Sequence, residues 1–276
     1  MSFHSPITKK ENIMKLFTAT LVVITGISLC AASFALGADD SFVGKWKFNP
    51  DKSQLAGLTY KVGEATPGQF TFTFGDDVET LSFDGKEHMT KFGNTWSITP
   101  NGSHAWKWVQ KRDGKVTSDA VWTVAEDGAT STYVSTEMRP DGSTSHDETT
   151  LKRTAGSGSS LVGTWQGTGT KIGSPTVLEM TQWNGDGYSL TNATYKGQTD
   201  FKLDGKEYTP KGPRVAKGTT VSGKAVDAHK FELTYKLNGK TTETDSWELA
   251  ADGKTLTDTV NYSGESKPEI DVYERQ

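Results

Sequence analysis

The feature that most constrains the fold is an internal repeat, because a unit that occurs twice in one chain predicts two similar domains. The segment FVGKW at residues 42–46 returns as LVGTW at residues 161–165. The segment DGKE at residues 84–87 returns unchanged at residues 204–207. Identity between the copies is patchy, so the sequence indicates an old duplication.

The repeat also sets the expected domain boundaries. Residues 155–160 contain only Ala, Gly and Ser, which is the composition of a flexible linker. We therefore predict a first domain at residues 41–154 and a second domain at residues 161–276. The length of 276 residues fits this count of two domains.

Residues 1–38 are predicted to be a secretory signal peptide. Lysines precede an apolar run at residues 16–36, and small residues follow it, which is the order of such a leader. We expect cleavage near residues 35–38 and a periplasmic or secreted mature chain with no stable membrane span. The alternative is an uncleaved anchor, because the run is just long enough to cross a bilayer. Leu29 stands where a lipidation motif needs a small residue, which argues against lipoprotein anchoring at Cys30.

Composition excludes several classes of protein. The formal net charge is −4, so we expect no basic surface for nucleic acid. Cys30 is the only cysteine, which excludes a disulfide framework, a cysteine-based zinc site and an iron–sulfur cluster. Mean hydropathy is −0.56, which is too polar for a multispanning membrane protein. We predict no metal and no cofactor, and the sequence leaves the oligomeric state open.

Hydrophobic alternation indicates β-strands in both repeats. Phe70, Phe72 and Phe74 are separated by threonines, and a period of two with aromatic or β-branched residues marks half-buried strands. Asn-Gly and Asp-Gly pairs, which suit tight type I′ turns, recur at 101–102, 113–114, 127–128 and 141–142. We predict an all-β protein of two tandem antiparallel up-and-down β-barrels, because closure of a meander removes its exposed edges. An open β-sandwich is the alternative.

The start of each repeat resembles the lipocalin signature. The first repeat opens with Phe42-x-Gly44-x-Trp46, and the second opens with Leu161-x-Gly163-x-Trp165. In lipocalins this tryptophan closes one end of the barrel, and an arginine of the last strand lies across it by cation–π stacking. Arg153 ends the first repeat and Arg275 ends the second. The resemblance implies that Arg153 covers Trp46 and that Arg275 covers Trp165. The implied barrel-closing residues, structural rather than catalytic, are Gly44, Trp46, Arg153, Gly163, Trp165 and Arg275.

The resemblance covers nearly the whole mature chain as two lipocalin-like barrels. Residues 46–53 and 272–275 also look like those of exported bacterial lipocalin-like proteins of unknown function. A barrel of this size holds either packed side chains or one small ligand. The expected function is therefore an exported binding protein for a small hydrophobic or amphipathic molecule.

Large side chains at alternating positions are the candidate walls of a ligand cavity. Trp106, Trp108 and Gln110 share one face of a predicted strand, while Lys107 lies on the opposite face. The alternatives are a packed core and an outward Trp surface that stacks on sugars or a partner, although an inward Lys107 would be unusual. The candidate ligand-binding residues are Phe70, Phe72, Trp106, Trp108, Gln110, Trp122, Phe231, Leu233, Tyr235 and Trp247.

No catalytic motif stands out, and we predict no catalytic residue. His146 is followed by Asp147 and Glu148, but neighbours on a strand point to opposite faces. Nucleophile elbows, phosphate loops and dinucleotide fingerprints are absent in the needed context. Two rival functions stay open: an isomerase, cyclase or hydrolase that uses a buried carboxylate or His inside a barrel, and an envelope protein whose solid barrels serve contacts.

Overall fold

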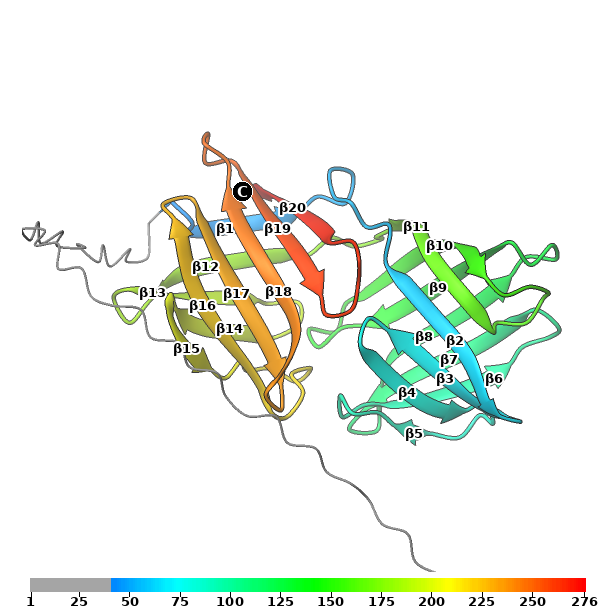
Figure 1. Cartoon of the computed structure of the whole chain (residues 1–276). Coiled ribbons are helices and arrows are strands. Elements are labelled where there is room, and N and C mark those ends of the chain that lie inside the picture. Colours follow the sequence, from blue (N-terminus) through cyan, green and yellow to red (C-terminus); the bar gives the residue numbers. More distant parts are fainter. Residues whose placement is uncertain (1–40) are drawn as a thin grey trace, which may run out of the picture. The chain divides into compact units, whose positions relative to one another are not determined.

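The computed structural model describes residues 41–276 as twenty β-strands in two antiparallel sheets of ten strands each (Figure 1). Two nearly closed sheets of this kind fit a lipocalin-like all-β fold, which confirms the predicted class. The predicted signal peptide and Cys30 lie outside the described residues. Within the described range, no helix has the length and apolarity that a bilayer crossing requires.

The first barrel is a continuous stretch of chain that runs from β2 to β11. Its sheet starts at β4 and continues through β3 to β2. β11 pairs with β2, and the other strands follow in reverse sequence order from β10 to β5. In that order its strands are β4 (Asp77–Ser82), β3 (Gln69–Phe74), β2 (Thr59–Thr66), β11 (Gly163–Lys171), β10 (Thr144–Ala155), β9 (Thr130–Met138), β8 (Lys115–Val124), β7 (Ala105–Arg112), β6 (Thr95–Pro100) and β5 (His88–Met89).

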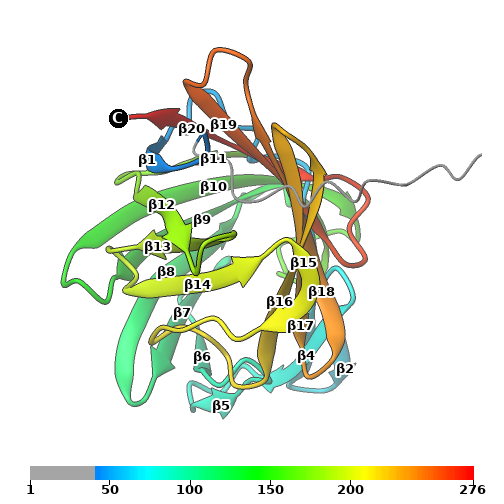
Figure 2. The same cartoon turned by 90° about the vertical axis from the view of Figure 1, so that its left-hand side faces the viewer.

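The second barrel combines the last nine strands with the first strand of the chain. Its edge strands β14 and β15 approach each other, so the sheet is nearly closed (Figure 2). In hydrogen-bonded order its strands are β14 (Gly197–Lys202), β13 (Gly187–Asn192), β12 (Val177–Trp183), β1 (Gly44–Phe48), β20 (Glu269–Arg275), β19 (Thr255–Tyr262), β18 (Lys240–Leu249), β17 (Lys230–Leu237), β16 (Thr219–Asp227) and β15 (Asp204–Tyr208).

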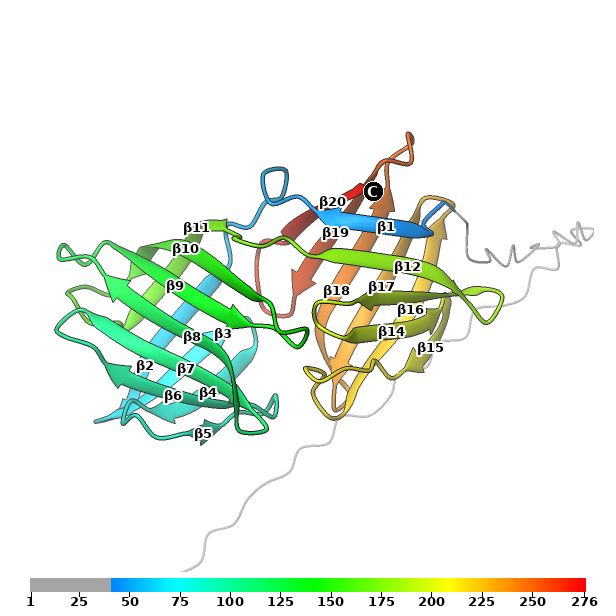
Figure 3. The same cartoon turned by 180° about the vertical axis from the view of Figure 1, so that it is seen from behind.

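The two repeats exchange their opening strands. β1 pairs with β12 and β20 of the second repeat, and Figure 3 shows blue β1 between red β20 and yellow-green β12. β11, which opens the second repeat, pairs with β10 and β2 of the first repeat. The expected division into residues 41–154 and 161–276 is therefore corrected at these two strands, and the first barrel is an insertion between β1 and β12.

The Gly/Ser segment at residues 155–160 is not a linker between barrels. It belongs to the hairpin that joins β10 to β11 inside the first barrel. Antiparallel strands joined by a short connection pair with each other as a hairpin, so the segment directs β11 back onto β10. The chain instead crosses between the barrels at residues 49–58 and again at residues 172–176.

Each barrel is closed by a tryptophan beneath an arginine, but the predicted partners are exchanged. The guanidinium carbon of Arg275 lies 4.2 Å from the ring centre of Trp46, and that of Arg153 lies 4.0 Å from the ring centre of Trp165. The expected pairs Trp46–Arg153 and Trp165–Arg275 are wrong, because each tryptophan lies on an exchanged strand. Trp46 on β1 belongs to the second barrel, and Trp165 on β11 belongs to the first.

The closing arginines also satisfy backbone carbonyls at the barrel end. Arg275 donates to Val43 O at 2.8 Å and to Gly253 O at 2.7 Å. Arg153 makes the equivalent bonds in the first barrel, to Val162 O and Gly128 O, both at 2.6 Å. The tryptophans themselves are fully buried, so both ends are sealed by the same arrangement.

The glycine of the repeated motif makes room for the guanidinium. A Cβ atom at Gly44 would lie 2.6 Å from Nη1 of Arg275, and a Cβ atom at Gly163 would lie 2.5 Å from Nη1 of Arg153. Both glycines also have a φ of +151°, which side-chain-bearing residues rarely adopt. The Gly-x-Trp spacing is thus explained by closure of the barrel end.

Only some of the predicted turns are type I′. Asp113 and Gly114 both have positive φ, and they join β7 to β8 directly. At residues 101–102, 127–128 and 141–142 only the glycine has positive φ. These turns therefore have other geometries, in which only the glycine needs left-handed backbone.

Candidate functional site

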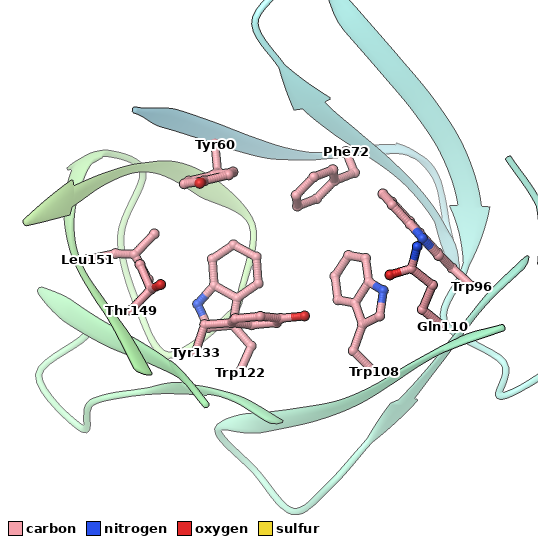
Figure 4. Close-up of a pocket in the computed structure, with 9 residues that line it drawn as sticks. All are labelled: Tyr60, Phe72, Trp96, Trp108, Gln110, Trp122, Tyr133, Thr149 and Leu151. Atoms are coloured by element: carbon pink, nitrogen blue, oxygen red, sulfur yellow. The ribbon is translucent and has the colours of Figure 1, made fainter. Parts of the chain in front are cut away.

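The first barrel contains a cavity of about 250 Å³ whose walls are mainly aromatic (Figure 4). Strands on opposite sides of the barrel supply the walls. Residues two apart on a strand share its inward face, so one strand can contribute two lining residues, as β7 and β10 do. The nine lining residues are Tyr60 on β2, Phe72 on β3, Trp96 on β6, Trp108 and Gln110 on β7, Trp122 on β8, Tyr133 on β9, and Thr149 and Leu151 on β10.

Edge-to-face packing fixes the orientation of these rings. The ring of Phe72 lies 5.2 Å from that of Trp108 at 70°, and 5.6 Å from that of Trp96 at 87°. On the other side, Trp122 meets Tyr133 at 5.8 Å and 80°. Such contacts favour the positive ring edge against the negative ring face. The walls are therefore preformed rather than free to collapse.

Small residues in the neighbouring wall leave the space open. Ala120 lies directly opposite Trp108 in the β7–β8 ladder and is buried. Ser131 occupies the inward position beside Trp122, and its hydroxyl accepts the indole N–H of Trp122 at 2.9 Å. Six of the nine lining residues, Phe72, Trp96 and Gln110 among them, are only half-buried, so the cavity is open to solvent and solutes.

Polar groups in the cavity are few and neutral. The indole N–H of Trp96 is buried and has no hydrogen-bond partner. Burial raises the pKa of Tyr133 to about 12 and raises the pKa of Tyr60 as well, so both phenols stay protonated at neutral pH. None of the nine lining residues is a carboxylate, a histidine or a basic residue. The cavity can therefore orient a neutral molecule by hydrogen bonds.

Several predicted ligand-binding residues meet at this cavity. Phe72, Trp108, Gln110 and Trp122 all line it. Two others from the same repeat pack against the core cluster of the first barrel outside the cavity lining: Phe70, which stacks on Phe83 at 4.0 Å, and Trp106. Whether the lining residues bind a ligand stays a prediction.

The predicted residues of the second repeat lie in a filled interior. Phe231, Leu233 and Trp247 are buried in the core of the second barrel. Phe231 stacks on Trp247 with ring centres 6.2 Å apart and planes at 12°. Tyr235 packs at the edge of this core and borders another cavity, of about 240 Å³. The packed-core interpretation therefore describes these positions best.

Five lining residues were not predicted from the sequence. Tyr133 lies directly opposite Trp122 across β8 and β9, so pairing of adjacent inward positions would have found it. Thr149 and Leu151 alternate on β10 in the same way. The unpredicted residues are Tyr60, Trp96, Tyr133, Thr149 and Leu151.

Neither a metal-binding arrangement nor a comparison with known proteins indicates what this site binds. Among residues 41–276, no group of three or more His, Cys, Asp or Glu side chains is arranged to hold a metal ion. No family model matches this chain, and no curated protein and no solved structure matches it.

Proposed function

We propose that the protein binds a small, mainly apolar, planar molecule in the cavity of the first barrel. The observation that carries the proposal is the cavity itself, which six aromatic rings enclose without any charged side chain. Ligand sites are typically apolar hollows with a few placed polar groups. None of the nine lining residues is a carboxylate, a histidine or a basic residue, and burial keeps the two tyrosines protonated, which favours binding over acid–base catalysis.

The size of the cavity limits the ligand to one or two rings. A cavity of roughly 150 Å³ accommodates benzene, and drug-sized ligands occupy roughly 300–1,000 Å³. The volume of about 250 Å³ lies between these two cases. A bicyclic aromatic molecule such as 2-naphthol is a suitable probe, because its rings would stack on the walls and its hydroxyl would use the polar groups.

Two side chains would orient such a ligand. The unpartnered indole N–H of Trp96 would donate to an acceptor oxygen, which removes the cost of a buried donor without a partner. The amide of Gln110, beside Trp96 in Figure 4, offers both a donor and an acceptor. We infer that the ligand carries one hydroxyl or carbonyl group at this end.

Calorimetric titration with 2-naphthol tests the proposal. We expect Trp108→Ala to weaken binding at least tenfold, because one wall of ring contacts is lost. Trp106→Ala is the matched control, since Trp106 lies two residues away on β7 but outside the cavity lining. Equal affinity in both variants would contradict the proposal, as would a wild-type protein that neither binds the probe nor carries a small molecule in native mass spectrometry after purification from its host.

We further propose that the chain is an exported member of the lipocalin-like binding proteins. The supporting features are the order of the leader and the two closed barrel ends with stacked Trp and Arg. Fractionation of host cells, with mass spectrometry of the N-terminus of the recovered protein, tests whether the chain is exported and cleaved. Recovery of the uncleaved chain in the cytoplasm would contradict it.

A further inference from the structure

Five carboxylates point into the second barrel from three adjacent strands. On β18, Asp245 lies two residues before Trp247, which belongs to the core. On β19, Asp258 lies two residues after buried Leu256. Residues two apart on a strand share a face, so these acids face inward with the core. The five residues, named here the inner acid cluster, are Glu243, Asp245, Asp258, Glu269 and Asp271.

The strand register brings the acids of the cluster together. Asp258 lies directly opposite Asp271 across β19 and β20. Asp245 lies opposite Val260, so it is the diagonal neighbour of Asp258. Directly opposed side chains on one face have Cβ atoms roughly 4.5–5.5 Å apart, and like charges at that distance destabilise the sheet. The arrangement is unfavourable for an empty barrel with ionised acids.

Several oxygen atoms of the cluster are buried without a partner. Asp245 and Asp258 are 5% and 4% exposed, and one carboxylate oxygen of each has no hydrogen-bond partner. The same is true of Oδ1 of Asp271, whose other oxygen accepts only a long bond of 3.5 Å from the hydroxyl of Tyr273. Buried polar groups are nearly always satisfied in folded proteins, so these unsatisfied acceptors point to a missing donor.

Among residues 41–276, no cationic side chain supplies that donor. Burial, together with repulsion from neighbouring acids, raises the pKa of Asp245 and of Asp258 well above the usual range, and no cation offsets this effect. Arg139 borders the cavity beside the cluster, but its guanidinium is bound to Glu137 at 3.0 Å. Lys236 on β17 is likewise paired with Glu207 at 2.8 Å.

Two cavities reach the cluster. One, of about 250 Å³, is lined in part by Glu269, Asp271 and Tyr273. The other, of about 240 Å³, is lined in part by Glu243 and Tyr262. Glu243, Glu269 and Asp271 therefore border space that a solute can enter. The buried Asp245 and Asp258 line neither cavity, but they lie next to these acids in the sheet. Tyrosine rings stand beside the acids that border the cavities. Carboxylates together with aromatic faces are the groups that attract an organic ammonium ion.

We propose that the inner acid cluster of the second barrel binds an organic cation, namely an aliphatic diamine or polyamine. The acids are spread over three strands rather than gathered around one point, and the described residues contain no group arranged to hold a metal ion. Carboxylates two residues apart on one strand are separated by about 7 Å. Two ammonium groups on a short alkyl chain match that spacing.

Calorimetric titration of the whole mature protein with spermidine at pH 8 tests this proposal. We expect Asp245→Asn and Asp258→Asn each to weaken binding at least tenfold, because each replaces a carboxyl group that could ionise and pair with a bound ammonium group by a neutral amide of the same shape. Glu248→Gln is the matched control: Glu248 lies on the outer face of β18 and pairs with Lys230 at 3.0 Å. We expect its affinity to stay within twofold of the wild type.

Proton release provides a second readout. Burial and neighbouring acids raise the pKa of Glu269 to about 7, and a bound cation would lower it again. Spermidine should therefore release protons and bind more weakly at pH 5.5 than at pH 8. If the Asp245→Asn and Asp258→Asn proteins fail to fold, Glu269→Gln is the variant to measure, because Glu269 lines the cavity. It should weaken spermidine binding and reduce proton release.

Three results would overturn the proposal. The first is a wild-type protein that binds no spermidine at millimolar concentration. The second is unchanged spermidine affinity in folded Asp245→Asn and Asp258→Asn proteins. The third is binding of Ca²⁺ alone that these variants abolish, in the absence of amine binding. Trp108→Ala should leave spermidine affinity unchanged, which separates this test from that of the aromatic cavity.

Discussion

The two barrels have the same closed end but opposite interiors. In both, an arginine covers a fully buried tryptophan and binds the carbonyls around it. Beyond this end, the first barrel encloses neutral rings around a cavity, while the second encloses stacked aromatic residues and then five acids. Closure is thus a property of the repeat, whereas the chemistry of the interior is set separately in each barrel.

Equivalent positions show where the two interiors differ. Trp122 in the first barrel and Trp247 in the second occupy the same place in their sheets. Opposite Trp122 stands Tyr133, whereas opposite Trp247 stands Asp258. Two residues before each tryptophan, the first barrel has Ala120, where the second has Asp245. A small residue leaves room for a cavity, while a carboxylate adds a charge that needs a partner.

The largest expected effect comes from cross-linking the exchanged strands. Lys45 on β1 lies opposite Glu179 on β12, and the equivalent pair in the first barrel is Thr164 opposite Lys61. Lys45→Cys with Glu179→Cys should form a disulfide in nearly all molecules, because Cys30 lies in the predicted leader and leaves no competing thiol in the mature chain. Without strand exchange Lys45 would face Lys61 instead. Mass spectrometry would contradict the exchange if Lys45→Cys with Lys61→Cys formed the disulfide.

The next effect concerns the buried tryptophans. Trp46→Ala should lower the free energy of unfolding of the second barrel by about 3–5 kcal/mol, the usual cost of deleting a buried Trp side chain. Trp165→Ala should do the same to the first barrel. Hydrogen exchange followed by mass spectrometry assigns the loss to peptides of one barrel. Loss of protection in β7–β9 of the Trp46→Ala protein would contradict the assignment.

A smaller effect is expected from pH. Burial raises the pKa of Glu269 to about 7 and that of Asp271 to about 6, above their ordinary values of 4.5 and 3.8. Between about pH 4 and pH 7 the folded second barrel therefore binds more protons than the unfolded chain, so its stability falls as pH rises.

Thermal melting tests whether the stability of the second barrel falls as pH rises. The second barrel should melt at a higher temperature at pH 5 than at pH 8, and Glu269→Gln combined with Asp271→Asn should flatten the difference. The first barrel, whose cavity is lined by neutral residues, serves as the internal reference. A second barrel that melts at the same temperature or lower at pH 5 would show that these acids are not destabilised by burial.

The fold class and the closing residues were predictable because each depends on local pattern. Alternation at Phe70, Phe72 and Phe74 places β3, and the repeated Gly-x-Trp with a terminal arginine predicts the closed ends. The exchange was not predictable, because both repeats carry the same closing residues and either arginine fits either tryptophan. Such symmetry is what makes swapping of equivalent elements possible at low cost.

The candidate sites were predictable only in part. Trp108 and Trp122 line the cavity as alternation suggests, but the same alternation at Phe231 and Leu233 gives a filled core. Whether large inward residues leave a cavity depends on the size of the residues across the barrel, which one strand does not reveal. The sequence did contain a pattern that predicts the acids of the second barrel: Asp245 lies two residues from Trp247 and therefore on the same, inward face of its strand.

A crystal structure of the protein soaked with 2-naphthol would show whether two equally closed barrels have different interiors. We predict density for one probe molecule in the first barrel, between the rings of Phe72, Trp108 and Trp122, and none in the core of the second barrel around Phe231 and Trp247. A first barrel without the probe, with its rings packed together, would show that the two interiors do not differ in this way, and so would a probe bound in the core of the second barrel.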